Sequence, residues 1–303
     1  MKLHQVILLS VSIIMLYGCR TNQSKPYAGT GYDVNSPDET IVLPGILHEI
    51  SGLTRIDDNN FACIQDEKGI IFFYDLSTKG ITRQIPFSKK GDYEGIARAG
   101  DTLFVLESDG VLYEVDNFDT DSIVVMPFTP GIDSKNSEGL CYDRKNDRLL
   151  IAPKENPLKG PGSKNKREIY GFSLRSMKLE DEPAFMFDID SLKDYAAYDG
   201  VNLHMKGKKQ KSSSKTIIKF RPSAIGIHPV TGDIYILSSE DFMLFIFTKN
   251  GGIKHVVKLN PLKFPQAEGI TFLENGDMLI SNEGQSKSPA SLQVLKYHAD
   301  WLK

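Results

Sequence analysis

Residues 267–284 read AEGITFLENGDMLISNEG: a short apolar strand that opens with Glu and Gly, a turn containing Asn-Gly-Asp, and a second apolar strand that ends in Asn-Glu. Apolar strands joined by such a turn are typical of β-hairpins, because Asn and Gly readily adopt the backbone conformations of a tight turn. The same pattern occurs four times earlier in the chain, opening at Ser51, Glu94, Glu138 and Ser223. The sequence therefore repeats one hairpin in five copies.

Each hairpin is followed by further apolar runs that predict additional strands. A third strand is expected at residues 70–74, 111–115, 169–173, 243–247 and 292–297, and a fourth at 81–87, 122–128, 184–189 and 253–259. The last unit has no fourth run, and residues 39–44, ahead of the first hairpin, are expected to supply it. The copies lie roughly 45 residues apart, which is the length of a four-stranded propeller blade.

The interval between Glu138 and Ser223 is nearly twice as long as the others, and it leaves two blade counts open. It could hold a sixth blade, or the polar segments 154–166 and 192–221 could be insertions. The polar composition of these segments favours insertions. We therefore predict an all-β fold, a β-propeller of five four-stranded blades with six as the alternative, its ring closed by the N-terminal strand.

The first residues of the innermost strands are the first candidates for a functional site. In a propeller the innermost strand of each blade lines the central channel, so Glu94, Glu138 and Glu268 are expected to face it, together with Ser51 and Ser223. A tiny residue follows each of them, as close approach of backbones near the axis requires.

A second set of candidates lies where the next strand of each hairpin ends. An acidic residue occurs at this point in every copy, and in the last copy Asn282 precedes it as a further channel-lining candidate. These acidic residues are Glu67, Asp109, Glu155, Glu240 and Glu283. The repeat thus predicts two rings of oxygen donors around the axis.

Such a concentration of negative charge needs compensation, because two carboxylates about 6 Å apart repel by roughly 3 kcal/mol at an effective dielectric constant of about 20. A divalent cation with oxygen ligands would compensate it, and calcium accepts such ligands in flexible geometry. Alternatively, Lys68, Lys154 and nearby arginines could neutralise the acids. The predicted metal ligands are the three glutamates of the first ring and the five acids of the second, and the expected cofactor is calcium.

The repeat resembles the SdiA-regulated family. The resemblance rests on the Glu-Gly-Ile/Leu hairpins, the Asp-Glu and Asn-Glu strand ends and the stretch 267–284, and it covers roughly residues 39–297. It implies a calcium-linked periplasmic propeller that is similar to the esterase-like phytase group. The chain departs from the family at Ser51 and Ser223, where Glu is usual, and in its long third unit.

The resemblance and the residues leave two functions open. One is an ion-responsive or interaction protein without catalysis. The alternative is a calcium-dependent phosphoesterase or esterase, in which the metal would neutralise substrate and activate water. The sequence contains no Gly-x-Ser-x-Gly motif, and its six histidines are scattered. Whether the protein is an enzyme, and whether a protein or a phosphorylated small molecule is its partner, stays open.

The N-terminus predicts export and lipid anchoring. Met1-Lys2 gives a positive start, residues 6–17 are mostly apolar, and Leu16 to Cys19 resembles the bacterial lipobox. We expect residues 1–18 to be a signal peptide, Cys19 to carry lipid such as palmitate, residues 19–38 to form a polar tether and residues 39–303 to form the propeller. The predicted location is the bacterial cell envelope, with the protein anchored in the bilayer, in the outer membrane facing the periplasm or the surface.

Charge and local motifs narrow the remaining possibilities. The chain has 36 Lys and Arg against 39 Asp and Glu, a net charge of −3, which does not indicate a nucleic-acid partner. Residues 188–192 begin like a calcium loop but lack its glycine. The basic segment 206–221 is expected to be a solvated insertion, with an anion-binding patch as the alternative. Cys63 and Cys141 lie in apolar runs and are expected to be buried thiols.

Overall fold

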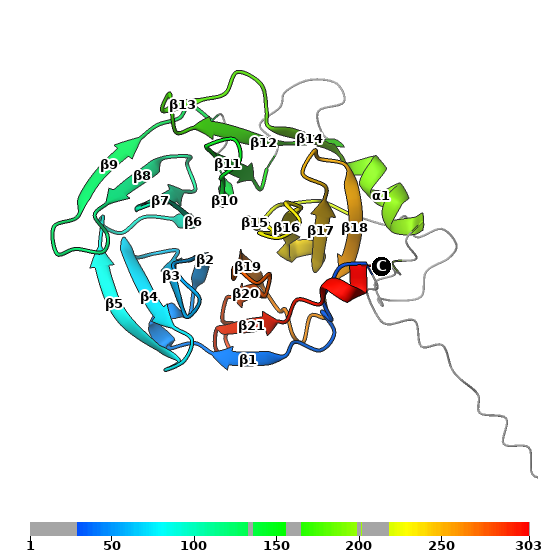
Figure 1. Ribbon diagram of the computed structural model, residues 1–303, viewed down its shortest axis with the longest axis horizontal. Helices are drawn as coiled ribbons and strands as arrows, with labels where there is room; N and C mark the ends of the chain where they lie inside the picture. Colours follow the sequence, from blue (N-terminus) through cyan, green and yellow to red (C-terminus); the bar gives the residue numbers. More distant parts are fainter. Residues whose placement is uncertain (1–28, 133–135, 156–164, 199–200, 202–217, 303) are drawn as a thin grey trace, which may run out of the picture.

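The computed structural model describes residues 29–132, 136–155, 165–198, 201 and 218–302. Five antiparallel sheets stand around a central axis like the blades of a propeller (Figure 1). The prediction of a five-bladed β-propeller is confirmed. The first three strands of each blade follow one another outward in the sheet, with the first strand innermost, so every inner strand opens at the same end of the ring.

The strands follow the repeat closely. Blade 1 holds β2 (Ile50–Arg55), β3 (Asn60–Gln65), β4 (Ile70–Asp75) and β5 (Gly80–Pro86); blade 2 holds β6 (Tyr93–Ala99), β7 (Thr102–Glu107), β8 (Leu112–Asp116) and β9 (Val124–Phe128). Blade 3 holds β10 (Ser137–Asp143), β11 (Arg148–Pro153), β12 (Lys166–Ser173), β13 (Lys178–Leu179) and β14 (Phe185–Asp188). Blade 4 holds β15 (Ala224–Ile227), β16 (Ile234–Ser238), β17 (Met243–Phe247) and β18 (Ile253–Lys258), and blade 5 holds β19 (Ala267–Phe272), β20 (Met278–Asn282) and β21 (Ser291–Leu295).

The N-terminal strand β1 (Glu39–Val42) completes blade 5. It pairs antiparallel with β21, with Glu39 opposite Val294 and Ile41 opposite Leu292. This pairing is the ring closure that the sequence predicts. It leaves no unpaired edge on β21, which would otherwise expose a row of backbone donors and acceptors.

Part of the segment expected to be a tether is packed against the ring. Tyr32 and Val34 are buried at 0% and 1% exposure, beside apolar side chains of blades 4 and 5. The Tyr32 hydroxyl donates a hydrogen bond of 2.5 Å to the carbonyl of Gly276. The globular part of the chain therefore begins before residue 39, because these aromatic and aliphatic side chains are apolar enough to join the core.

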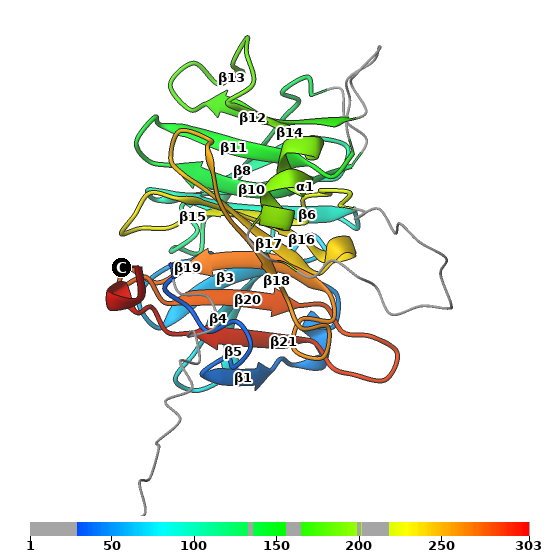
Figure 2. The same cartoon turned by 90° about the vertical axis from the view of Figure 1, so that its right-hand side faces the viewer.

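The long third unit contains an insertion and no sixth blade among its described residues. Strand β12 pairs with β13 at one end and with β14 at the other. A helix, α1 (Ile189–Tyr198), follows β14 and contacts β18 on the outside of the ring (Figure 2). Asp188 accepts a hydrogen bond of 2.9 Å from the Ser191 amide, so the segment that begins like a calcium loop is the capped start of this helix. Most of the basic segment 206–221 lies outside the described residues.

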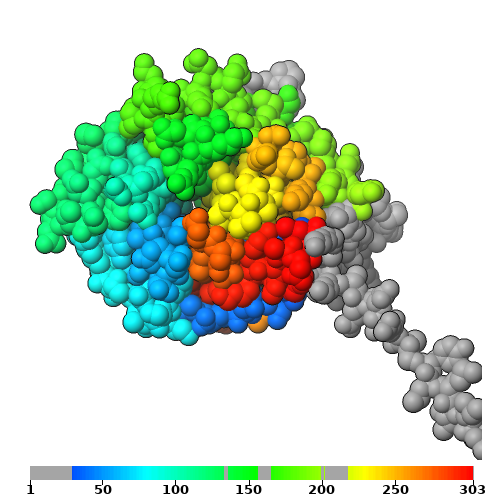
Figure 3. Space-filling view, in the orientation of Figure 1, coloured from blue at the N-terminus to red at the C-terminus, as the bar shows by residue number. Residues whose placement is uncertain are grey.

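The core lies between neighbouring blades, and the blades pack closely around a small central hollow (Figure 3). Phe73 of blade 1 and Ile96 of blade 2 belong to one apolar cluster, and each further pair of blades shares another. The thiols of Cys63 and Cys141 are free. No helix within the described ranges is long and apolar enough to cross a membrane.

Candidate functional site

A β-bulge opens the inner strand in four of the five blades. The pairing register between the first two strands shifts between Ile50 and Gly52, and the corresponding shifts in blades 2, 3 and 5 leave Glu94, Glu138 and Glu268 as the extra residues. Bulges bend a strand and re-aim its side chains, and they are enriched beside functional sites. All three glutamates line the narrow void at the axis.

The glycine after each bulge makes room for the next blade. A Cβ atom on Gly95 would lie 2.7 Å from the Leu140 Cβ and 2.9 Å from the Glu138 carbonyl oxygen. Because the second of these neighbours is backbone, it could yield only if the adjacent inner strand moved. The Glu-Gly pair of the repeat therefore serves two purposes: the glutamate enters the channel and the glycine lets the two strands approach.

Among the described residues, the three glutamates share the ammonium group of Lys154. The Lys154 Nζ lies 3.0 Å from the Glu138 Oε1, and the Lys154 charge also interacts with Glu94 and Glu268. Glu268 accepts a further hydrogen bond of 3.0 Å from the Ser239 hydroxyl. Glu138 and Glu268 are 3% and 9% exposed, so their charges are largely removed from water. We call these four charged residues the acidic mouth.

Burial and crowding make the acidic mouth hold protons tightly. Burial, followed by the charges of Glu138 and Asp92, raises the pKa of Glu94 to about 9. Burial and the Glu138 charge raise the pKa of Glu268 to about 8. For Lys154, burial lowers the pKa, but the combined negative charges outweigh this effect and the net pKa is raised. A deprotonated ring thus carries more negative charge than Lys154 can balance.

Ser51 and Ser223 take the place of a glutamate in two blades, and the structure gives them a structural role. The Ser51 hydroxyl donates a hydrogen bond of 2.6 Å to the carbonyl of Tyr93, the residue before Glu94. The Ser223 hydroxyl donates one of 2.7 Å to the carbonyl of Ala267, the residue before Glu268. Each serine therefore fixes the backbone from which the next glutamate projects.

The second predicted ring does not gather at the axis as one set. Glu240 forms ion pairs of 2.7 Å with Lys219 and Arg221, which lower its pKa against the opposing effect of burial. Glu155 is exposed and lies 3.9 Å from Arg221. The outer acids therefore have partners or solvent of their own.

The remaining members of this ring also have separate environments. Asp109 and Glu67 are exposed, and the Asp109 carboxylate accepts a hydrogen bond of 3.1 Å from the Val111 amide in its own turn. Asn282 is completely buried, and its amide group donates long bonds of 3.3 Å to the Ser291 hydroxyl and 3.4 Å to the Lys263 carbonyl. It does not line the narrow void beside the glutamates.

Glu283 belongs to a second group of acids near blades 1 and 5, and its charge also raises the pKa of Glu268 in the acidic mouth. Burial raises its pKa, and the charges of Asp66 and Glu49 raise it further. Burial, then Glu49 and Glu67, raise the pKa of Asp66 to about 6, and its Oδ1 is buried without a hydrogen-bond partner among the described residues. An unpartnered buried carboxylate oxygen suits a cation or a proton.

Sequence reasoning selected neither Glu49 nor Asp92 as site residues. Asp92 raises the pKa of Glu94, and its carboxylate accepts a hydrogen bond of 2.5 Å from the Ser108 hydroxyl. Both residues stand two positions before the opening residue of an inner strand. That shared repeat position was a signal that could have found them. Cys19 lies outside the described residues.

The acidic mouth contains the type of ligand atom that a hard divalent cation prefers. They are carboxylate oxygens, the ligands that calcium uses, and their repulsion is only partly compensated. In the described ranges, however, no three Asp, Glu, His or Cys side chains converge closely enough to hold an ion as they stand. Binding would therefore require side-chain rearrangement around Lys154.

The fold and this site define a five-bladed β-propeller with buried carboxylates at one end of its axis. A family model described as SdiA-regulated matches residues 30–286, and the chain belongs to this family. No curated protein matches the chain.

Solved structures resemble the chain in fold. Glutaminyl cyclase of Myxococcus xanthus matches 87% of this chain and 96% of its own at 13% identity, with a TM-score of 0.54. A luciferin-regenerating enzyme matches the same shares of the two chains at 8% identity, with a TM-score of 0.47. The first likeness supports the propeller fold, and neither bears on activity.

Proposed function

We propose that the protein is a lipid-anchored propeller of the bacterial cell envelope that binds calcium at its acidic mouth and responds to the ion. The observation that carries this proposal is the crowding of partly buried Glu94 and buried Glu138 and Glu268 around the Lys154 ammonium group. Such a ring stores unfavourable repulsion that either protons or a cation can relieve. A divalent cation would relieve it without requiring two carboxyl groups to stay protonated.

Each residue of the acidic mouth has a role in this proposal. Glu94 and Glu268, which hold their protons most tightly, would release them on binding and supply oxygen ligands. Glu138 would exchange its ion pair with Lys154 for the ion, which frees the ammonium group to move outward. The bound ion would supply positive charge only, so the proposal assigns the site no reaction.

The test is a calcium titration of the full-length protein by calorimetry and thermal melting at pH 8.5, with chelator as the reference. Binding to the folded form at a hundredfold excess over Kd stabilises it by about 2.7 kcal/mol. The combined Glu94→Gln and Glu268→Gln variant removes two ligands and their repulsion. We expect it to melt at a higher temperature than the parent in chelator and to gain little from calcium.

The matched control is Asp181→Asn with Glu182→Gln, which removes two exposed acids on the outside of blade 3. It should keep the calcium response of the parent. A double glutamine variant that responds to calcium like the parent would contradict the site, and a parent that does not respond would contradict the function.

Lipid anchoring is tested separately at Cys19. Two acyl chains give stable membrane attachment, whereas the protein without them has no comparable anchor in this proposal. Cys19→Ala should move the protein from the membrane to the soluble fraction. Mass spectrometry of the mature parent that shows an unmodified chain would contradict the anchor and leave the calcium test unaffected.

A further inference from the structure

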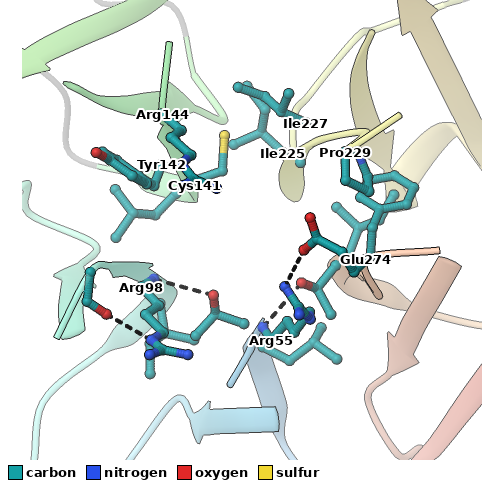
Figure 4. Close-up of a pocket in the computed structure, with 18 residues that line it drawn as sticks. Arg55, Arg98, Cys141, Tyr142, Arg144, Ile225, Ile227, Pro229 and Glu274 are labelled. Atoms are coloured by element: carbon teal, nitrogen blue, oxygen red, sulfur yellow. Dashed lines mark hydrogen bonds and ion pairs between the residues drawn. The ribbon is translucent and has the colours of Figure 1, made fainter. Parts of the chain in front are cut away.

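A second cavity opens at the other end of the inner strands. It has a volume of about 460 Å³ and is lined by residues from all five blades (Figure 4). The space narrows to a constriction at the acidic mouth, because the void beside its three glutamates holds only about 10 Å³, the space of a single water molecule. Five aliphatic side chains line both voids: Leu53, Ile96, Leu140, Ile225 and Ile270.

The charge of this cavity is opposite to that of the acidic mouth. Its lining includes three arginines, Arg55, Arg98 and Arg144, and a single acid, Glu274. Because arginine stays protonated, the cavity has excess positive charge over the whole accessible pH range. We call it the arginine cavity.

The three arginines differ in how many of their guanidinium N–H groups have a hydrogen-bond partner within the protein. Arg98 is held rigidly: its Nε donates 2.8 Å to the Gly100 carbonyl, a terminal nitrogen donates to the Ile56 carbonyl, and the group lies 5.7 Å from the centre of the Phe118 ring. A donor held in place before binding loses little entropy when a ligand arrives.

Arg55 and Arg144 retain unused donor capacity. The Arg55 guanidinium forms ion pairs of 2.6 Å with Glu274 and 3.4 Å with Asp58, but its Nε is buried without a hydrogen-bond partner among the described residues. Arg144 is exposed, and its positive charge opposes the burial that raises the pKa of the neighbouring Tyr142 hydroxyl. The Glu274 carboxylate therefore occupies part of the position on Arg55 that the oxyanion of a ligand would take.

The wall supplied by blades 4 and 5 is mainly apolar. Ile227 and Pro229 come from the end of β15 and the turn after it, and Phe272 ends β19. The arginines come from blades 1 to 3: Arg98 and Arg144 lie on the opposite side of the cavity, and Arg55 lies beside Glu274 of blade 5 (Figure 4). A ligand that fits both sides has an oxyanion at one end and an apolar body at the other.

We propose that the arginine cavity binds a small organic anion, with a phosphate or carboxylate group on the arginine side and an apolar body against Ile227, Pro229 and Phe272. Arginine recognises both oxyanions through paired N–H donors. The cavity volume falls in the usual range of small-molecule sites. This site is independent of the calcium proposal, because the constriction separates the two.

Binding is tested by calorimetry on the full-length protein in chelator, at low salt. The probes are phenyl phosphate, benzoate, inorganic phosphate and benzyl alcohol. Phenyl phosphate or benzoate should bind at least about tenfold more tightly than the probe that lacks its charged or apolar half. The stronger of the two identifies the head group. Equal binding of phenyl phosphate and inorganic phosphate would overturn the proposal of an apolar wall.

Variants then locate the binding. Arg144→Ala removes an exposed guanidinium and should weaken binding about tenfold, the loss expected for a charge-assisted contact. Glu274→Gln removes the competing carboxylate and should strengthen binding. Arg175→Ala, an exposed arginine in the β12–β13 turn, is the matched control and should have no effect. If Arg144→Ala and Arg175→Ala reduce affinity equally, or Glu274→Gln does not raise it, the site is wrong.

Discussion

The acidic mouth and the arginine cavity are built on the same five inner strands, yet one contains buried acidic side chains and the other contains arginines. At the start of the strands a bulge turns Glu94, Glu138 and Glu268 inward, where burial raises the pKa of each. At the far end Arg55 and Arg98 emerge from regular strands and reach backbone carbonyls or Glu274. The acids at one end are partly neutralised by their raised pKa values and by Lys154, whereas the arginines at the other end keep their charge and only some of their donors have partners.

This difference follows from how each strand ends. A bulge bends the strand and re-aims the glutamate side chain, and the glycine beside it lets the next inner strand approach. The open turn at the other end leaves room for long arginine side chains and solvent. The same repeat can thus supply a proton- or cation-dependent site and a permanently positive one.

The largest effect is expected when Lys154 loses its charge. Lys154→Met keeps the length of the side chain but leaves Glu138 without its 3.0 Å partner. Breaking such a pair while one charge stays buried costs about 3 kcal/mol. Thermal unfolding at pH 8.5 in chelator should show the loss, and calcium should restore more stability than in the parent.

Lys145→Met, which removes an exposed lysine of the β10–β11 turn, is the control and should change neither quantity. Phenyl phosphate affinity should stay at the parental value in both variants, because the arginine cavity does not use Lys154. Parental stability and calcium response in Lys154→Met would show that the ammonium group does not balance the ring.

A smaller effect is expected from Gly95→Ala. The added methyl would stand 2.9 Å from the Glu138 carbonyl oxygen, so the inner strand of blade 3 has to move. Overpacking of this kind costs about 2 kcal/mol. Gly45→Ala is the control, because a Cβ at Gly45 meets no atom within 4 Å. Denaturant unfolding should separate the two variants, and equal midpoints would contradict the close approach.

Counted per pH unit and per carboxyl group, the smallest expected effect is the change of stability with pH in the absence of calcium. Glu94 and Glu268 have folded-state pKa values of about 9 and 8, above the ordinary value of 4.5. Between pH 5 and 9 the folded protein therefore holds protons that the unfolded chain has lost, and unfolding releases them. Stability should fall as the pH rises through this window, by at most about 1.4 kcal/mol per pH unit for each group.

The double variant Glu94→Gln with Glu268→Gln should flatten this profile. Calcium should flatten it as well, because the ion takes over the compensation that protons provide at lower pH. Melting temperatures measured from pH 5 to 9 in chelator and in calcium give the comparison. A parent whose stability rises over this range would contradict the raised pKa values.

The hairpin repeat predicted most of the fold because every blade uses the same alternation of apolar strands and turns. Strand β17 occurs at the predicted residues, and β1 closes the ring as expected. Helix α1 was not predicted, because residues 188–192 were compared with a metal loop rather than with a capped helix start. Its apolar residues Ile189, Leu192 and Ala196 have the helical spacing that would have revealed it.

The site was predicted in part. The repeat placed Glu94, Glu138 and Glu268 together, because inner-strand starts must converge on the axis. It could not place the outer acids, because a residue after a strand end has no fixed direction, and Glu240 turns to Lys219 and Arg221. The sequence pattern also could not predict how many cationic side chains compensate the glutamates, because the position of the Lys154 ammonium group depends on three-dimensional packing.

Closure of the ring by β1 also has a consequence for synthesis. The Thr40 hydroxyl donates a hydrogen bond to the side chain of Gln293, 253 residues later in the sequence. The first strand to be synthesised therefore has no pairing partner until the last strand has been made. The earlier blades can form as the chain emerges, but the ring stays open until blade 5 is complete. Loop closure over such a span is slow. We expect this final step to set the folding rate, and the open ring to be the form that most needs protection by chaperones.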